Sequence, residues 1–345
     1  MRWLSDRTVE HLRRVAEWPD LADTKYRLLE ELGRGGMGVV YLAEDAVLGR
    51  RVALKVVGTG ALDSEAARRM LREARIIARL EHPGIVPVHD AGALPDGRLF
   101  YAMKRVDGRR LDELPAETSM PETLRIFQRI CEAVAFAHAH GVLHRDLKPE
   151  NVMVGPFGEV LVMDWGVAKI LDEGKDAPPD APAFEPAASG TAEGSVVGTL
   201  AYMAPEQADG QLDRVGRPTD IYALGAVLYY LLTRRAPFDG EAAQRRARAG
   251  SEAPPPAPRQ LDPRIARPLE AIVAKAMAPD PGERYGTAEE LAADAARFLD
   301  GRRVLAYRES LLERAARLFA RYRTPILLVL AYLLMRSLLL LYRGR

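Results

Sequence analysis

Residues 144–151, with the sequence HRDLKPEN, constrain this chain more than any other stretch. They follow a helix-like run that ends at Gly141 and precede a short apolar run, so we expect a loop held between packed elements. In this loop the Asp146 carboxylate can accept a proton from a hydroxyl, and the Lys148 ammonium can neutralise a phosphoryl group. The amide oxygen of Asn151 can bind a hard cation. A polar turn with a helix cap is the alternative, but this order of residue types seldom recurs by chance.

A glycine pattern near the start of the chain points to the same chemistry. Gly33, Gly35 and Gly38 have the spacing G-x-G-x-x-G, and only a backbone without Cβ approaches phosphates closely. Alone the pattern is weak, because a Rossmann nucleotide site also shows it, although a helix should then follow. Here strand-like residues follow, and a second strand-like run, 51–57, carries Lys55 in its middle. A lysine in an apolar strand is usually at an exposed edge, but after this glycine hairpin a phosphate contact is favoured.

Two further motifs lie downstream of the loop. Asp164 opens the triplet DWG after the strand-like run 160–163, and Glu206 ends the triplet APE. In order and residue type, the motifs closely resemble those of eukaryotic-type protein kinases over residues 26–300. Trp165 departs from the family pattern, which usually has phenylalanine, and we expect it to re-pack the surrounding core without inactivating the site.

The resemblance is closest to the eukaryotic-like (Hanks-type) serine/threonine kinases of bacteria. Lys148 in the loop and Thr199 before the APE triplet resemble serine/threonine kinases, whereas tyrosine kinases differ at both places. The implied fold is α+β and two-lobed. It has a small, mostly antiparallel β lobe with one helix over residues 26–103, a hinge over 104–108 and a large helical lobe over 109–300.

The pattern of apolar residues predicts individual elements within that fold. We expect strands over residues 83–88 and 98–103, and helices over 64–80 and 124–140. Residues 1–25 are predicted to be a helical extension in front of the lobes.

Two long-range roles follow from the resemblance. Asp220 would anchor the backbone of the catalytic loop, and Glu206 would pair with Arg284. His138 and His140 are interpreted as packing or surface residues and not as metal ligands, because no second ligand cluster accompanies them.

The resemblance implies in-line transfer of the ATP γ-phosphoryl group to a protein hydroxyl, with Mg²⁺ or Mn²⁺ as cofactor. Asp146 would accept or orient the hydroxyl, Lys55 and Lys148 would offset phosphate charge, and Glu73 would pair with Lys55. Glu73 could instead be one charge among the arginines around it. The implied metal ligands are Asn151 and Asp164. The implied ATP-contacting residues are Leu32, Gly33, Arg34, Gly35, Gly36, Met37, Gly38, Val40, Ala53, Lys55, Met103, Val106 and Met153.

Two other classes of protein were weighed. A pseudokinase scaffold would be expected to have lost Lys55, Asp146 or Asp164, and the chain retains all three. A small-molecule phosphotransferase is disfavoured, because in the family Glu206 and Arg284 brace a platform for protein substrates. The sequence therefore favours an active serine/threonine protein kinase, with a pseudokinase as the alternative.

Residues 171–194 are rich in Ala, Pro, Gly, Asp and Glu and hold almost no large apolar residue, so we expect them to be mobile. Arg145 resembles the arginine with which many kinases hold a phosphorylated residue of the activation loop. Ser195 lies where the family's activating phosphosite commonly falls, and Thr191 and Ser189 are less favoured. The sequence predicts autophosphorylation at Ser195.

One strongly apolar run, 326–342, lies near the end of the chain. As a helix it spans about 26 Å, slightly short of a hydrocarbon core of about 30 Å. Arg336 opposes insertion, but the many leucines outweigh it. We expect a transmembrane helix over residues 325–342 after a basic amphipathic segment over 301–324. An interfacial hairpin, or a helix that mediates oligomers or packs on the large lobe, remains an alternative.

The charge distribution and the cysteine content limit the partners and the cellular compartment that we expect. Four arginines within residues 314–323 outnumber Arg343 and Arg345 beyond the apolar run, which would keep the kinase domain in the cytoplasm. The single cysteine, Cys131, excludes an internal disulfide and suits a reducing compartment. A net charge of +1 argues against general nucleic-acid binding. We expect protein substrates and a membrane as partners, and dimerisation is possible.

Overall fold

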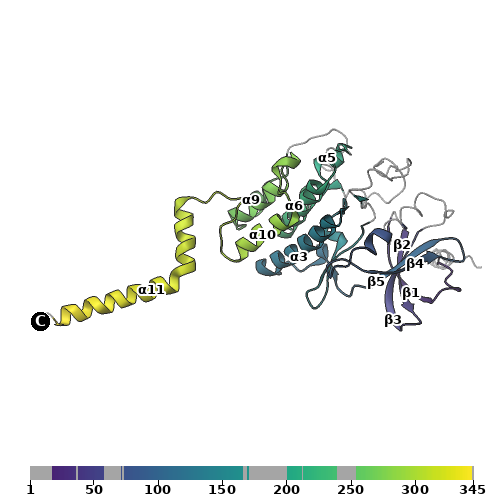
Figure 1. The fold of residues 1–345 in the computed structure, drawn as a ribbon, viewed down its shortest axis with the longest axis horizontal. Helices are drawn as coiled ribbons and strands as arrows, with labels where there is room; N and C mark the ends of the chain where they lie inside the picture. Colours follow the sequence, from purple (N-terminus) through teal and green to yellow (C-terminus); the bar gives the residue numbers. More distant parts are fainter. Residues whose placement is uncertain are drawn as a thin grey trace, which may run out of the picture.

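The computed structural model describes residues 18–35, 38–57, 71, 74–165, 169–170, 200–211, 213–238 and 254–343. Figure 1 shows a β-sheet lobe formed by the first part of the chain, followed by a helical lobe. The last helix, α11, extends from the helical lobe to the C-terminus. The expected fold, with an antiparallel small lobe and a helical large lobe, is confirmed.

The small lobe is a five-stranded antiparallel sheet in the order β1-β2-β3-β5-β4. β3 pairs with β2 on one side and with β5 on the other, so it is a central strand. Lys55 on β3 stands opposite Val40 and Tyr101, and only 6% of its surface is exposed. This lysine is therefore not at an exposed edge. The strands are β1 (Tyr26–Gly35), β2 (Gly38–Asp45), β3 (Arg50–Val56), β4 (Val88–Ala93) and β5 (Leu99–Lys104).

The strand predicted over residues 83–88 was wrong in its position. The structure places β4 at Val88–Ala93, and residues 83–87 form a turn and an extended connection. Pro83 and Pro87 lack the backbone N–H that a sheet ladder requires, so the ladder begins only after them. Within this connection Ile85 makes an isolated parallel bridge to Val162, which joins the small lobe to the run that precedes Asp164.

The helix predicted over residues 64–80 is described only in part. Leu71 and residues 74–77 are helical, and most of the rest of the prediction, including Glu73, lies outside the described residues. Ile76 and Ile77 are buried in the core cluster that also contains residues of the large lobe. The helix therefore ties the small lobe to the large one.

The large lobe is built around two long helices. In α3 (Met120–Ala139) Ser119 caps the first turn by accepting a hydrogen bond from the backbone N–H of Glu122. α6 (Arg217–Thr233) is apolar on nearly all faces, as a helix in the middle of a core must be. The other helices are η1 (Leu111–Glu113), η2 (Pro149–Asn151), α5 (Pro205–Ala208), α8 (Pro258–Leu261), α9 (Arg267–Ala276), η3 (Pro281–Glu283) and α10 (Ala288–Leu299). The short strands are β6 (Arg109–Arg110), β7 (Val142–Leu143), β8 (Val152–Val154), β9 (Val160–Val162) and β10 (Lys169–Ile170).

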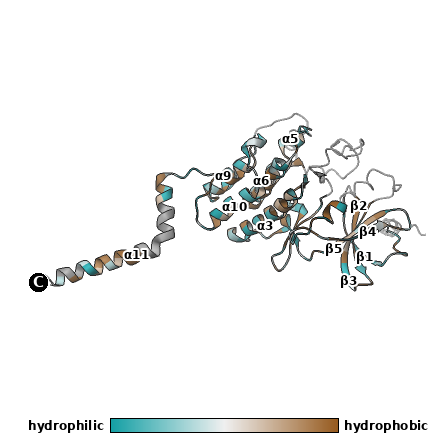
Figure 2. Cartoon of the chain, viewed as in Figure 1, coloured by the Kyte–Doolittle hydropathy of each residue, from teal (hydrophilic) through white to brown (hydrophobic). Residues whose placement is uncertain are grey.

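α11 (Leu311–Arg343) points away from the lobes and bends near its middle (Figure 1). The sequence of α11 includes Pro325, and proline, which has no N–H for the helix ladder, commonly causes bends in helices. Hydrophobic residues recur along α11 (Figure 2), and large ones such as Leu328 and Leu334 are exposed. In the described part of the chain, no helix reaches the length and hydropathy needed to cross a membrane.

Candidate active site

The loop that carries Asp146 is held by a buried carboxylate from α6. The two Asp220 oxygens accept hydrogen bonds of 2.8 Å from the backbone N–H groups of His144 and Arg145. His138 Nε2 lies 2.8 Å from one of the same oxygens. Burial raises the pKa of Asp220, but the hydrogen bond and charge of His138 and the backbone donors outweigh burial and lower it. The predicted anchoring role of Asp220 is confirmed, whereas no sequence signal indicated the contribution of His138.

Three of the predicted site residues meet inside this loop. Lys148 Nζ lies 3.1 Å from the Asp146 carboxylate. Asn151 Nδ2 donates to the Asp146 backbone carbonyl at 2.7 Å and lies 3.3 Å from its carboxylate. These bonds use the amide nitrogen of Asn151, not the oxygen that a cation would bind. The pair of Asp146 and Lys148 thus presents an acceptor beside a positive charge.

Lys55 connects the small lobe to Asp164, a predicted metal ligand. Its Nζ lies 3.0 Å from Oδ1 of Asp164, and Asp164 has a left-handed backbone with φ of 54°. Desolvation raises the pKa of Asp164, but the charge and hydrogen bond of Lys55 outweigh this and lower it. The folded structure therefore favours the ionised form of Asp164. The predicted partner of Lys55, Glu73, lies outside the described residues.

The glycine pattern forms the tip of the β1–β2 hairpin, where Gly35 stands opposite Gly38. Gly38 has φ of 130°, and a Cβ built there would lie 2.2 Å from the carbonyl oxygen of Val56. Only glycine fits at this position. Gly36 and Met37, which we predicted to contact ATP, lie outside the described residues.

The other predicted ATP-contacting residues come from several elements. Ala53 on β3 stands opposite Met103 on β5, at the end of the sheet nearest the hinge. Val106 follows β5, and Met153 lies on β8 opposite Leu161. The remaining members, Leu32, Gly33, Arg34 and Val40, lie on β1 and β2.

A buried ion pair holds the start of α5 in the large lobe. Arg284 donates to both carboxylate oxygens of Glu206 at 2.8 Å, as the sequence predicted. Thr219 Oγ1 also donates to Glu206 at 2.8 Å. These bonds fix the short helix α5, which begins within the APE triplet.

Comparisons with known proteins agree with this geometry. The sequence profile of the protein kinase domain family matches residues 26–295. The chain belongs to the protein kinase family. Among these kinases it is similar to bacterial serine/threonine kinases. It is 36% identical over 298 residues to PknD of Protochlamydia amoebophila and 38% identical over 284 residues to PrkC of Bacillus subtilis.

These relatives are longer proteins. The matches cover 80% and 81% of this chain but only 30% and 41% of PknD and PrkC, so the chain spans well under half of their length. The crystal structure of the Mycobacterium tuberculosis PknI kinase domain is similar with a TM-score of 0.58 and 29% identity. That match covers 79% of this chain and 96% of the PknI domain.

This kinase buries its unusual tryptophan against the His144 ring, and the two ring planes are tilted by 50°. The Trp165 ring is 1% exposed and lies 4.6 Å, centroid to centroid, from the His144 ring. His144 Nε2 lies 3.0 Å from the Met163 carbonyl, and its Nδ1 lies 3.3 Å from the Asp146 N–H. Only the neutral tautomer that carries its proton on Nε2 satisfies both contacts. The indole N–H is directed at the carbonyl of Val162 at 3.4 Å, a bond that phenylalanine could not make.

Two residues of the candidate site have side chains that fit a role in binding a metal ion. Asn151 and Asp164 offer the hard oxygen donors that Mg²⁺ prefers. Among the described residues, no group of three or more His, Cys, Asp or Glu side chains could hold a metal alone. Mg²⁺ commonly combines one or two carboxylates with phosphate oxygens, which matches this small donor set.

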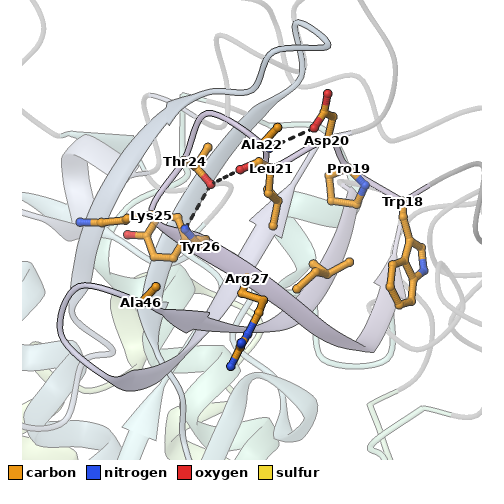
Figure 3. Close-up of a pocket in the computed structure, with 11 residues that line it drawn as sticks. Trp18, Pro19, Asp20, Leu21, Ala22, Thr24, Lys25, Tyr26, Arg27 and Ala46 are labelled. Carbon is orange, nitrogen blue, oxygen red and sulfur yellow. Dashed lines mark hydrogen bonds between the residues drawn. The ribbon is translucent and has the colours of Figure 1, made fainter.

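A cavity of about 500 Å³ lies elsewhere on the small lobe of this kinase. It is lined by residues at and before β1, including Trp18, Lys25 and Arg27 (Figure 3). None of the predicted catalytic, metal-binding or ATP-contacting residues lines it. The motif residues, and not this cavity, therefore define the candidate active site.

Proposed function

We propose that this protein is a serine/threonine protein kinase that transfers the γ-phosphoryl group of ATP to Ser or Thr hydroxyls of proteins. The observation that carries the proposal is the pairing of Asp146 with Lys148, 3.1 Å apart, on a loop fixed by Asp220. Such fixed charges need no reorganisation when phosphoryl transfer begins. Catalysis by positioning and electrostatics is what phosphoryl transfer requires.

Each side chain then has a separate task. Asp146 accepts or orients the proton of the attacking hydroxyl, while Lys148 offsets charge on the transferring group. Lys55 holds phosphate oxygens of ATP with its buried ammonium group. Asn151 and Asp164 would hold Mg²⁺ or Mn²⁺, which neutralises charge on the phosphates when bound.

Label transfer from ATP tests this function. The full chain should phosphorylate itself or a generic basic protein when Mg²⁺ or Mn²⁺ is present, and chelation by EDTA should stop the reaction. Asp146→Ala, Lys55→Ala and Asp164→Ala should each lower the rate by a factor of about 10² or more. Asp262→Ala, which removes an aspartate outside the site, is the control and should keep wild-type activity. Undiminished transfer by Asp146→Ala would disprove the assignment.

We further propose that the kinase autophosphorylates Ser195, a residue outside the described part of the chain. Arg145, beside the catalytic aspartate, supplies the kind of cation that holds a phosphorylated loop. Ser195→Ala should then lower activity, and mass spectrometry of active enzyme should find phosphate on Ser195. Active enzyme with no phosphate on residues 187–199 would exclude this switch.

A membrane contact through α11 is also proposed. Its exposed leucines and the flanking arginines in the sequence support it, because such helices bind anionic lipid surfaces. The positive charge before the apolar run would keep the catalytic lobes in the cytoplasm. In cell fractionation, full-length protein should remain in membranes through a carbonate wash, whereas a chain ending at Ser310 should not. Full-length protein that is monomeric in buffer without detergent would refute the anchor.

A further inference from the structure

The residue before the catalytic aspartate has an unusual backbone. Arg145 has φ of 68°, in the left-handed region that residues other than glycine seldom adopt. Such a conformation persists only where surrounding contacts impose it. One contact is the bond from its N–H to Asp220 at 2.8 Å. The other is at its carbonyl, which accepts a hydrogen bond of 2.9 Å from Gln207 Nε2.

The Gln207 side chain has a single orientation. Its Oε1 accepts a hydrogen bond of 3.3 Å from the backbone N–H of Ala204, while its Nε2 donates to Arg145. A flipped amide would place oxygen against the Arg145 carbonyl and NH₂ against the Ala204 N–H. Gln207 is only 7% exposed, so water cannot readily replace either bond. The oxygen and the nitrogen of this amide therefore each have a hydrogen-bond partner.

Gln207 also stands at a junction between two parts of the site. The preceding residue, Glu206, is fixed to the large lobe by Arg284 and Thr219. α5 is thereby immobilised on one side, and Gln207 reaches from it to a loop that is 62 positions earlier in the chain. This amide joins α5 to the loop that carries Asp146.

We propose that Gln207 is a positioning residue for Asp146. By holding the Arg145 carbonyl, it keeps the left-handed turn that directs Asp146 toward the substrate hydroxyl. The position of the APE triplet, residues 204–206, is thereby coupled to the position of the Asp146 carboxylate. This inference rests on the proposed kinase function.

Two near-isosteric variants test the inference by steady-state kinetics with a peptide substrate. Gln207→Met keeps the volume of the side chain but removes the donor, so kcat should fall about 10-fold or more, since small misplacements of catalytic groups reduce rates strongly. KM for ATP should stay within a factor of two, because Gln207 lies outside the residues expected to bind the nucleotide. Gln211→Met, a nearby glutamine that bonds to Asp209 and Arg214, is the matched control and should match wild type.

Gln207→Glu supplies a readout that a merely structural role would not give. As a carboxylate it repels the Arg145 carbonyl, but as a neutral acid its O–H can donate the missing hydrogen bond. Burial raises the pKa of such a carboxyl. The rate of Gln207→Glu relative to wild type should therefore rise as pH falls from 8 to 6, while the ratio for Gln207→Met stays flat.

Hydrogen exchange measures the coupling without relying on catalysis. Amides of residues 143–147 should exchange faster in Gln207→Met than in wild type or Gln211→Met. If wild type transfers phosphate and Gln207→Met has normal kcat and normal exchange, the inference is overturned. If Gln207→Met does not fold, a flat pH ratio for Gln207→Glu overturns it instead. If wild type transfers no phosphate, the proposed function fails, and the exchange experiment still decides whether Gln207 holds the loop.

Discussion

The guanidinium group of Arg284 forms two hydrogen bonds of 2.8 Å with the carboxylate of Glu206, and both side chains are almost completely buried. Burial raises the pKa of Glu206, but the hydrogen bonds and charge of Arg284 outweigh burial and lower it. Glu206 is therefore a buried anion that depends on one cation.

Removing that cation should destabilise the large lobe strongly. Arg284→Met leaves the Glu206 charge without its partner, and breaking a buried pair in this way costs about 3–5 kcal/mol of unfolding free energy. Urea unfolding at pH 7 measures the loss. Arg264→Met breaks the exposed pair with Asp262 and should cause no measurable change. A similar loss in both variants would contradict the prediction.

The stabilising contribution of Asp220 should depend on pH with a defined sign. Its pKa is lower in the folded protein than in the unfolded chain, so the folded state favours the ionised form. The contribution is complete above the unfolded value of about 3.9 and is lost as pH falls through the lower folded value. Asp220→Asn lacks this titration. The difference in unfolding free energy between wild type and Asp220→Asn should be largest at pH 7 and smaller at pH 3.5, and a constant difference would exclude the assignment.

Trp165→Phe tests whether the tryptophan stabilises the core that surrounds it. The smaller ring loses the bond to Val162 and leaves a void beside His144, which should cost about 1–3 kcal/mol of stability. The variant should keep phosphoryl transfer, because phenylalanine is the usual residue of the family at this position. Fluorescence should lose the contribution of the buried Trp165, which is 1% exposed, whereas Trp18 is 40% exposed. Greater stability in Trp165→Phe would show that the tryptophan strains the core.

Asp294 should fix the segment that leads to α11. Its carboxylate is fully buried and accepts hydrogen bonds from Tyr285, from Arg297 and from the backbone N–H groups of Leu305 and Ala306 at 2.8 to 3.0 Å. Asp294→Asn replaces one acceptor oxygen with a donor, so at least one of those bonds is lost.

Hydrogen exchange of the peptide that contains Leu305 and Ala306 reports the loss directly. Exchange should accelerate about tenfold or more in Asp294→Asn, because these amides become exposed by local opening. Asp300→Asn changes an exposed residue at the end of the same helix and should leave the rate unchanged. Equal protection in wild type and Asp294→Asn would show that the carboxylate is not what holds this segment.

Much of the small lobe could be predicted from local signals. The alternation of apolar residues and the glycine spacing located β1, β2 and β3, because strand periodicity and tight turns are short-range properties. The strand near residue 88 was misplaced, because the apolar residues between Pro83 and Pro87 suggest a strand that two prolines cannot form. Proline removes a backbone donor, which mattered more here than the apolar pattern.

What the sequence determined by itself is the set of reactive groups and their local order. Asp146, Lys148 and Asn151 lie within six residues, so the loop alone brings them together once it folds. Tertiary structure decided which distant groups hold that loop. His138 joins Asp220 across 82 positions, and Gln207 reaches Arg145 across 62. Contacts over such separations depend on how helices pack, and no local periodicity encodes the direction in which a buried amide or imidazole points.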